Sequence, residues 1–180
     1  TITTTDTTSG SVTVTGGTIG ANVAVNSGGG LAFSSGSTTL NGKVSAASGS
    51  NLSVGGQLTT GGTDNIGDTT AVNLGSTGTL TLGGNETTGM FTSFGGSLLG
   101  TGNKLQATGY DLRGGTISAN LGTGNLSVNQ AGSSTTLNGT SDSTTVTIWN
   151  GSLLLGAAER LNNSANVAVH NTGALNLQGF

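Results

Sequence analysis

Residues 150–180 read NGSLLLGAAERLNNSANVAVHNTGALNLQGF, and this stretch carries the pattern that decides the fold. It contains apolar pairs whose two members are separated by a single residue: Leu153/Leu155, Val167/Val169 and Leu175/Leu177. Residues two apart on a β-strand face the same side, so each pair predicts a short strand with one apolar face. Gly, Asn, Ser and Thr fill the intervals between the pairs, and these residues favour tight turns. The stretch therefore predicts short strands joined by turns.

The same spacing recurs upstream as paired strands with a turn between them. The further copies are Val23/Val25 with Leu31/Phe33, Val44/Ala46 with Leu52/Val54, Val72/Leu74 with Leu80/Leu82, Ile117/Ala119 with Leu126/Val128, and Val146/Ile148 with Leu153/Leu155. Short strands that repeat about every 20–25 residues are the sequence mark of a stacked solenoid, because one turn alone cannot bury its apolar face. We therefore predict an all-β fold, a right-handed parallel β-helix of about seven or eight turns with a narrow aliphatic core.

The composition bounds the function. Of the 180 residues, 35 are Gly and none is Cys or Pro, which excludes disulfides and thiolate metal sites. Only 6% are charged and the net charge is -3, so no electrostatic footprint for nucleic acid is present. No apolar run approaches the roughly 20 residues of a membrane helix, and we expect no membrane insertion. Because the chain begins at Thr1, we expect residues 1–180 to be a single solenoid segment of a longer, processed protein.

The stretch 84–116 departs from the plain pattern because it concentrates aromatic residues and cations. Phe91, Phe94, Tyr110 and Arg113 all lie there. Aromatic residues beside cations often mark contact surfaces, so these four residues are our candidate contact surface, on an irregular turn or protruding loop. The alternative is a broader turn of the solenoid that is filled with larger side chains.

No catalytic, cofactor or metal site is predicted. Asp64 and Asp68 could hold calcium if their loop folded around the ion, but an ordinary Asx-turn loop explains the same residues. Asp111 and Arg113 are expected to form a surface ion pair, and His170 is expected to be a solvated turn residue.

The segments 151–161 (GSLLLGAAERL), 167–169 (VAV) and 173–180 (GALNLQGF) together resemble the autotransporter-associated β-strand repeat of large secreted bacterial passenger proteins. The resemblance is close over about 30 residues and general elsewhere. It implies a parallel β-helix that is displayed on, or released from, Gram-negative cells, where many such proteins serve as adhesins or stalks. It therefore also implies an extracellular or cell-surface location.

The expected function is a structural or adhesive passenger segment, not an enzyme, with host, surface or self contacts as its partners. One alternative is a self-assembling extracellular filament or surface-layer subunit, since neither 1–10 nor Phe180 resembles a cap that would block end-to-end stacking. The other is a carbohydrate-active β-helix enzyme, which would need acidic residues from successive turns to converge beside Arg113 or Lys104.

Overall fold

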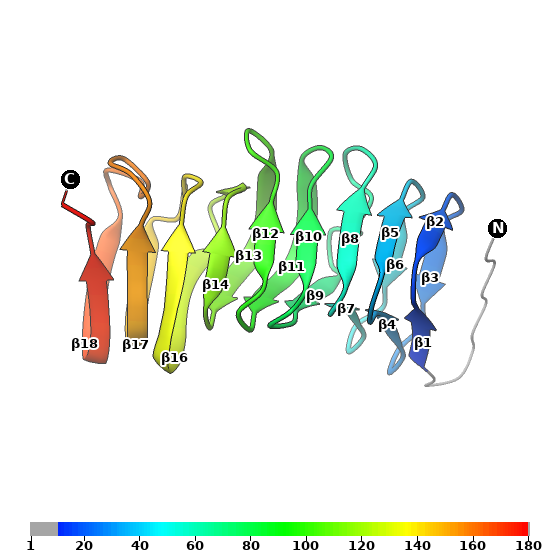
Figure 1. Ribbon diagram of the computed structural model, residues 1–180, viewed down its shortest axis with the longest axis horizontal. Helices are drawn as coiled ribbons and strands as arrows, with labels where there is room; N and C mark the ends of the chain where they lie inside the picture. The colour runs from blue at the N-terminus through cyan, green and yellow to red at the C-terminus, as the bar shows by residue number, and fades with distance from the viewer. Residues whose placement is uncertain (1–10, 180) are drawn as a thin grey trace.

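The computed structural model describes residues 11–179 as an all-β, parallel β-solenoid of about eight turns, which confirms the predicted fold class (Figure 1). The segments noted above for lacking a cap, 1–10 and Phe180, lie outside the described residues. The part of the chain described contains no helix long and apolar enough to cross a membrane.

The strands fall on three faces that run the length of the coil. The first face consists of β1 (Ser11–Val14), β4 (Gly30–Phe33), β7 (Asn51–Val54), β9 (Ala71–Leu74) and parts of β11 (Glu86–Ser93), β13 (Lys104–Leu112), β16 (Asn125–Leu137), β17 (Thr145–Leu155) and β18 (Asn166–Asn176). The second face consists of β2 (Gly17–Ile19), β5 (Ser37–Leu40), β8 (Gln57–Thr60), β10 (Thr79–Thr81), β12 (Ser97–Leu99), β14 (Gly115–Ile117) and the later parts of β16, β17 and β18. The third face is made of β3 (Val23–Val25), β6 (Val44–Ala46), the beginnings of β11 and β13, β15 (Asn120–Leu121) and isolated bridges.

The register of the pairing differs from the repeat that the sequence suggests. Val23 pairs with Val44 on the third face, whereas Val72 pairs with Leu52 on the first face. The apolar pairs that look equivalent in the sequence therefore belong to different faces, because strands on all three faces share the same alternating pattern. Along the first face, Leu31, Leu52 and Val72 follow one another at intervals of 21 and 20 residues, so the true period is more regular than the apparent one.

The core is a set of stacked apolar ladders whose widest side chains lie in the middle and the early turns. Phe33, Phe91 and Tyr110 are fully buried among Leu, Val and Ile. The stretch 84–116 contains β11, β12, β13 and β14, and these strands pair in register with the turns before and after them. Its larger side chains are thus accommodated without breaking the ladders.

Asn side chains stabilise the corner where the chain enters the third face. The Oδ1 atom of Asn22 accepts a hydrogen bond from the backbone N–H of Lys43, on the next turn, at 2.8 Å. The Oδ1 atom of Asn85 accepts one from the backbone N–H of Lys104, again on the next turn, at 2.8 Å. Glycine is needed where turns approach closely. Gly36 has φ +64° and a Cβ there would overlap the carbonyl oxygen of Thr15.

Tyr110 links three points of the buried backbone. Its hydroxyl donates to the carbonyl of Leu105 at 2.7 Å and accepts the N–H groups of Ala107 at 3.1 Å and Gly122 at 2.7 Å. Burial raises the pKa of the phenol, so the hydroxyl stays protonated and able to donate.

We predict that Tyr110→Phe lowers the free energy of unfolding by about 1–3 kcal/mol, because the buried N–H of Ala107 loses its hydroxyl partner, whereas Gly122 N–H and Leu105 O keep the 2.9 Å bond between them. Urea denaturation followed by circular dichroism measures this loss. A change below about 0.5 kcal/mol, the range of neutral surface substitutions, would contradict the network described here.

Candidate functional site

Only two of the four residues predicted to form a contact surface are exposed. Phe91 and Tyr110 are fully buried, because each occupies an inward position of the first-face ladder. Phe94 is 45% exposed, and Arg113 also reaches the surface. The expectation is therefore corrected to Phe94 and Arg113, which the fold places together although 18 residues lie between them along the chain.

Phe94 and Arg113 lie at the corner that follows the first face, one turn apart. The guanidinium carbon of Arg113 lies 5.1 Å from the centroid of the Phe94 ring, a cation–π contact. Nε and Nη2 of Arg113 both donate to Oδ2 of Asp111, at 2.9 and 2.7 Å, which confirms the predicted ion pair. The hydrogen bonds and charge of Asp111 raise the pKa of Arg113. The ion pair with Asp111 thus holds the guanidinium over the Phe94 ring and neutralises the charge of Arg113.

The same corner carries a second stack further along the coil. Trp149 is 43% exposed, and its ring lies 4.5 Å from that of His170 with an interplanar angle of 17°. His170 lies within β18 and is exposed, so the expectation that it occupies a turn is wrong; the long strand continues through the corner. Beside this stack, the side chains of Asn129, Asn150 and Thr172 form a ladder, with Asn150 bonded to each neighbour at 3.1 Å.

We call the residues at this corner the corner row: Phe94, Arg113, Asn129, Trp149 and His170. Successive backbone bonds, from Phe94 N–H to Leu74 O and from Arg113 N–H to Ser93 O, place its first members in one line along the coil. Sequence reasoning missed Trp149, because nothing near it in the chain relates it to Phe94. Only the register of the turns reveals that relation.

A surface hollow of about 340 Å³ adjoins Phe94. It is lined by Ser53, Val54, Gly55, Asn73, Gly75 and Phe94. Gly55 and Gly75 occupy the same corner position as Phe94 in the two preceding turns, as their N–H bonds to Phe33 O and Val54 O show. The hollow therefore exists because two side chains are missing from the corner beside an aromatic wall.

Most charged residues gather on the third face. Lys43 and Lys104 directly precede the ladder residues Val44 and Leu105. Apart from Asp111 and Arg113, every charged residue of 11–179 lies on this ladder or within two residues of it: Lys43, Asp64, Asp68, Glu86, Lys104, Asp142, Glu159 and Arg160. Charges that look scattered in the sequence therefore share one side of the molecule.

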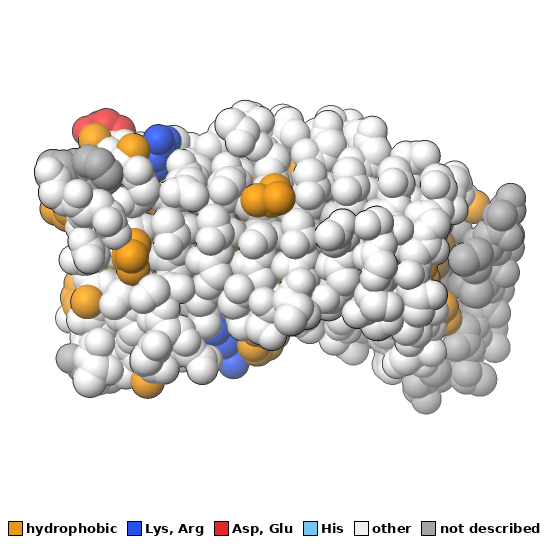
Figure 2. All heavy atoms as spheres, viewed as in Figure 1, with side chains coloured by type: hydrophobic (Ala, Val, Ile, Leu, Met, Phe, Trp, Pro, Cys, Tyr) orange, Lys and Arg blue, Asp and Glu red, His pale blue; other side chains and the backbone are white. Residues whose placement is uncertain are grey.

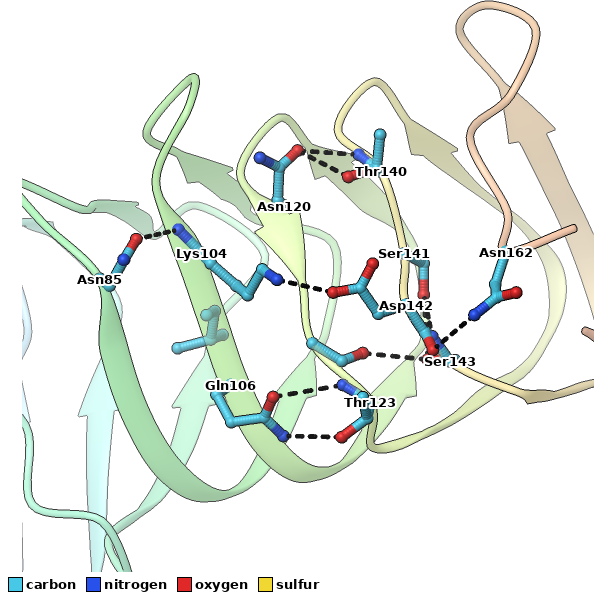
Figure 3. Close-up of polar contacts among 12 residues, drawn as sticks. Asn85, Lys104, Gln106, Asn120, Thr123, Thr140, Ser141, Asp142, Ser143 and Asn162 are labelled. Carbon is cyan, nitrogen blue, oxygen red and sulfur yellow. Dashed lines mark hydrogen bonds and ion pairs between the residues drawn. The ribbon is translucent and has the colours of Figure 1, made fainter. Parts of the chain in front are cut away.

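The outward groups of the third face are bonded largely to one another (Figure 3). Lys104 Nζ lies 2.6 Å from Asp142 Oδ2 in a half-exposed ion pair that spans two turns, and such a pair contributes little to stability. Asn120 Oδ1 accepts both the backbone N–H and the hydroxyl of Thr140 at 3.0 Å. Figure 3 also shows Gln106 bonded to Thr123 on the adjacent turn. The polar side chains drawn on this side therefore form hydrogen bonds and an ion pair with one another.

The residues considered for calcium do not converge on a common point. Asp68 pairs with Lys43 at 3.3 Å, and Asp64 has a left-handed backbone with φ 53°. Asn65 Oδ1 accepts the N–H of Gly62 at 2.8 Å, as in a loop closed by its own side chain. Among residues 11–179, no group of three or more His, Cys, Asp or Glu side chains could hold a metal ion.

Glu86 is the one charged side chain placed inside the coil among the described residues. It is 1% exposed and takes an inward position of the third-face ladder, beside Ile66 and Leu105. Its Oε2 accepts the N–H of Ile66 at 2.9 Å, while Oε1 has no hydrogen-bond partner among the described residues. Burial raises the pKa of this carboxyl above its usual value, and the nearby charge of Asp64 adds to that effect. Sequence reasoning did not single out Glu86.

Comparisons with family models, with curated proteins and with solved structures found no match for this chain.

We predict that Glu86→Gln removes a pH dependence of stability. Because the pKa of Glu86 is higher in the folded than in the unfolded protein, its contribution is present below the unfolded pKa and is lost as pH rises through the folded pKa. The variant should therefore gain stability relative to the parent as pH rises from about 4 to about 8, on the order of 1 kcal/mol. Urea denaturation at both pH values measures this.

Glu159→Gln provides the matched control, since Glu159 is an exposed glutamate. Its stability difference from the parent should change little over the same pH interval. A stability difference between Glu86→Gln and the parent that is constant with pH, or that moves in the parent's favour as pH rises, would show that the buried carboxyl is not the group that titrates.

Proposed function

We propose that this chain is a rigid β-helical segment of a secreted or cell-surface bacterial protein, with a structural and adhesive role. The observation that carries the proposal is the parallel pairing of the first face, which runs from β1 to β18 through every turn. Each inner strand bonds the turns on both sides, so bending the coil would require many backbone bonds to break together. Such a rigid rod is suited to holding a binding surface at a distance from the cell surface.

The exposed surface supports this role. Figure 2 shows a face made mostly of backbone and of side chains that are neither hydrophobic nor charged. The residues between inward ladder positions are small, such as Ala32, Asn73 and Thr147, and they are only partly covered. The resemblance of residues 151–180 to the autotransporter-associated repeat supports the extracellular or cell-surface location in the proposal.

The adhesive part of the proposal rests on the corner row. It presents planar groups in a line, held by a cation–π contact at one end and a ring stack at the other. A carbohydrate-active enzyme is less favoured, since Arg113 pairs with Asp111, two residues before it, and Lys104 pairs with Asp142 alone among the described ion pairs. Glycosidase chemistry needs two carboxylates that flank one bond.

A self-assembling filament is the second candidate, and the strand β18 favours it. Among residues 11–179, β18 pairs with β17, and Val169 and Leu177 of this last described turn are half-exposed. An open parallel edge is a template for another strand. Electron microscopy of the purified protein distinguishes the two: ordered fibres support the filament, and dispersed single rods oppose it.

Antibodies raised against residues 11–179 test the proposed location on cells of the source organism. We expect them to label intact cells or the culture medium, and we expect external protease to remove the cell-bound signal. Labelling that appears only after the cells are permeabilised would overturn the proposal. An antibody against a cytosolic protein controls for cell integrity.

A further inference from the structure

We infer that the corner row and its adjoining hollow bind a neutral polysaccharide, with one sugar ring in the hollow against Phe94. This inference rests on the adhesive part of the proposed function. The rod itself is independent of it, and the two can fail separately.

The hollow is an open surface depression with the volume of a small ligand site. Its volume of about 340 Å³ lies at the lower end of the range of about 300–1,000 Å³ that is usual for small-molecule sites. Phe94 forms an apolar wall, and the side chains of Ser53 and Asn73 bring hydroxyl and amide groups to the rim. A pyranose ring offers the complementary chemistry, because its C–H faces are apolar and its edge carries hydroxyls.

The wall is held in position before any ligand arrives. Arg113 lies over one side of the Phe94 ring, and Asp111 fixes Arg113 through both of its hydrogen bonds. A side chain that is already ordered loses little entropy when a ligand stacks on it, which favours binding. The glycines at 55 and 75 keep the approach to the ring open.

A second stacking position lies on the same corner, three turns beyond Phe94. Trp149 is half-exposed and is backed by His170. The amides of Asn129 and Asn150 run beside it and can exchange hydrogen bonds with hydroxyls. At about 4.8 Å per turn the two aromatic positions are about 14 Å apart along the coil, a distance that a chain of sugars spans but a single sugar does not. Two contacts on one chain raise the overall affinity.

The charge of the corner selects an uncharged ligand. Arg113 and Asp111 neutralise each other, and the remaining charges of 11–179 lie along the third-face ladder. A nucleic acid could stack on the same rings, but its phosphates require cations that this corner does not supply, and the net charge of -3 opposes them.

Affinity electrophoresis through native gels containing dextran, glycogen, hydroxyethyl cellulose or galactomannan tests the inference. We expect at least one of these polymers to retard the parent protein. Phe94→Ala should weaken that retardation by about tenfold or more, as for loss of a central aromatic contact. Trp149→Ala should weaken it less, and because Trp149 is the single tryptophan, binding should also shift the intrinsic emission of the parent.

Gly55→Leu fills the hollow without removing any group. Its φ lies outside the left-handed region, and a Cβ would meet Ser34 O at 3.5 Å, Phe33 O at 3.7 Å and Ser34 Cα at 3.8 Å, all ordinary contacts, so the variant should fold. We expect it to abolish retardation. Gly20→Leu is the matched control, since a Cβ there has nothing within 4 Å and lies away from the hollow, and it should behave as the parent.

The inference is overturned if none of the four polymers retards the parent, or if Gly55→Leu is retarded as strongly as the parent. It is also overturned if a labelled single-stranded oligonucleotide binds with dependence on Phe94 and competes with the polymer. Circular dichroism of each variant confirms that it remains folded. Loss of polymer binding in a protein that still labels intact cells would leave the rod proposal standing.

Discussion

The structure depends on the in-register hydrogen bonding of each turn to the next. A single turn of about 20 residues makes short strands that cannot bury their own apolar side, so the turns are stable only as a stack. The pairing aligns inward residues of the first face, such as Leu52, Val72 and Phe91, in one ladder. It also aligns the corner positions, and this second alignment brings Phe94 to Arg113 and Trp149 to His170.

The fold class could be predicted from the sequence, but the register could not. Alternating apolar residues and frequent glycines predict stacked strands, and that prediction is confirmed. The pairs at Val23 and Val72 look alike because every face obeys the same alternation, yet they lie on different faces. The turn lengths that separate the faces vary, and no local residue pattern records them. For the same reason the site was predicted only in part. Phe94 and Arg113 were identified, whereas Phe91 and Tyr110 point inward and Trp149 was missed.

The same alignment separates two kinds of polar chemistry. The third face carries charged and amide groups that satisfy one another, and it places Glu86 inside the coil with one oxygen unbonded. The corner row carries aromatic and amide groups with half of their surface open. We therefore assign a mainly structural role to the third face and a binding role to the corner. Both assignments follow from register, because residues far apart in the chain meet only when successive turns are correctly aligned.

The most direct test of the register is a pair of engineered disulfides, since the chain has no cysteine of its own. Ser53 and Asn73 are paired on neighbouring turns of the first face, at a separation of about 4.8 Å that falls within the range a disulfide tolerates. Ser45 and Asn73 occupy matching positions in the apparent sequence repeat, but Ser45 pairs with Ala24 on the third face. The register predicts that Ser53→Cys/Asn73→Cys cross-links on oxidation and that Ser45→Cys/Asn73→Cys does not, as measured by mass spectrometry of the unreduced protein. Cross-linking of the second pair, or failure of the first, would contradict it.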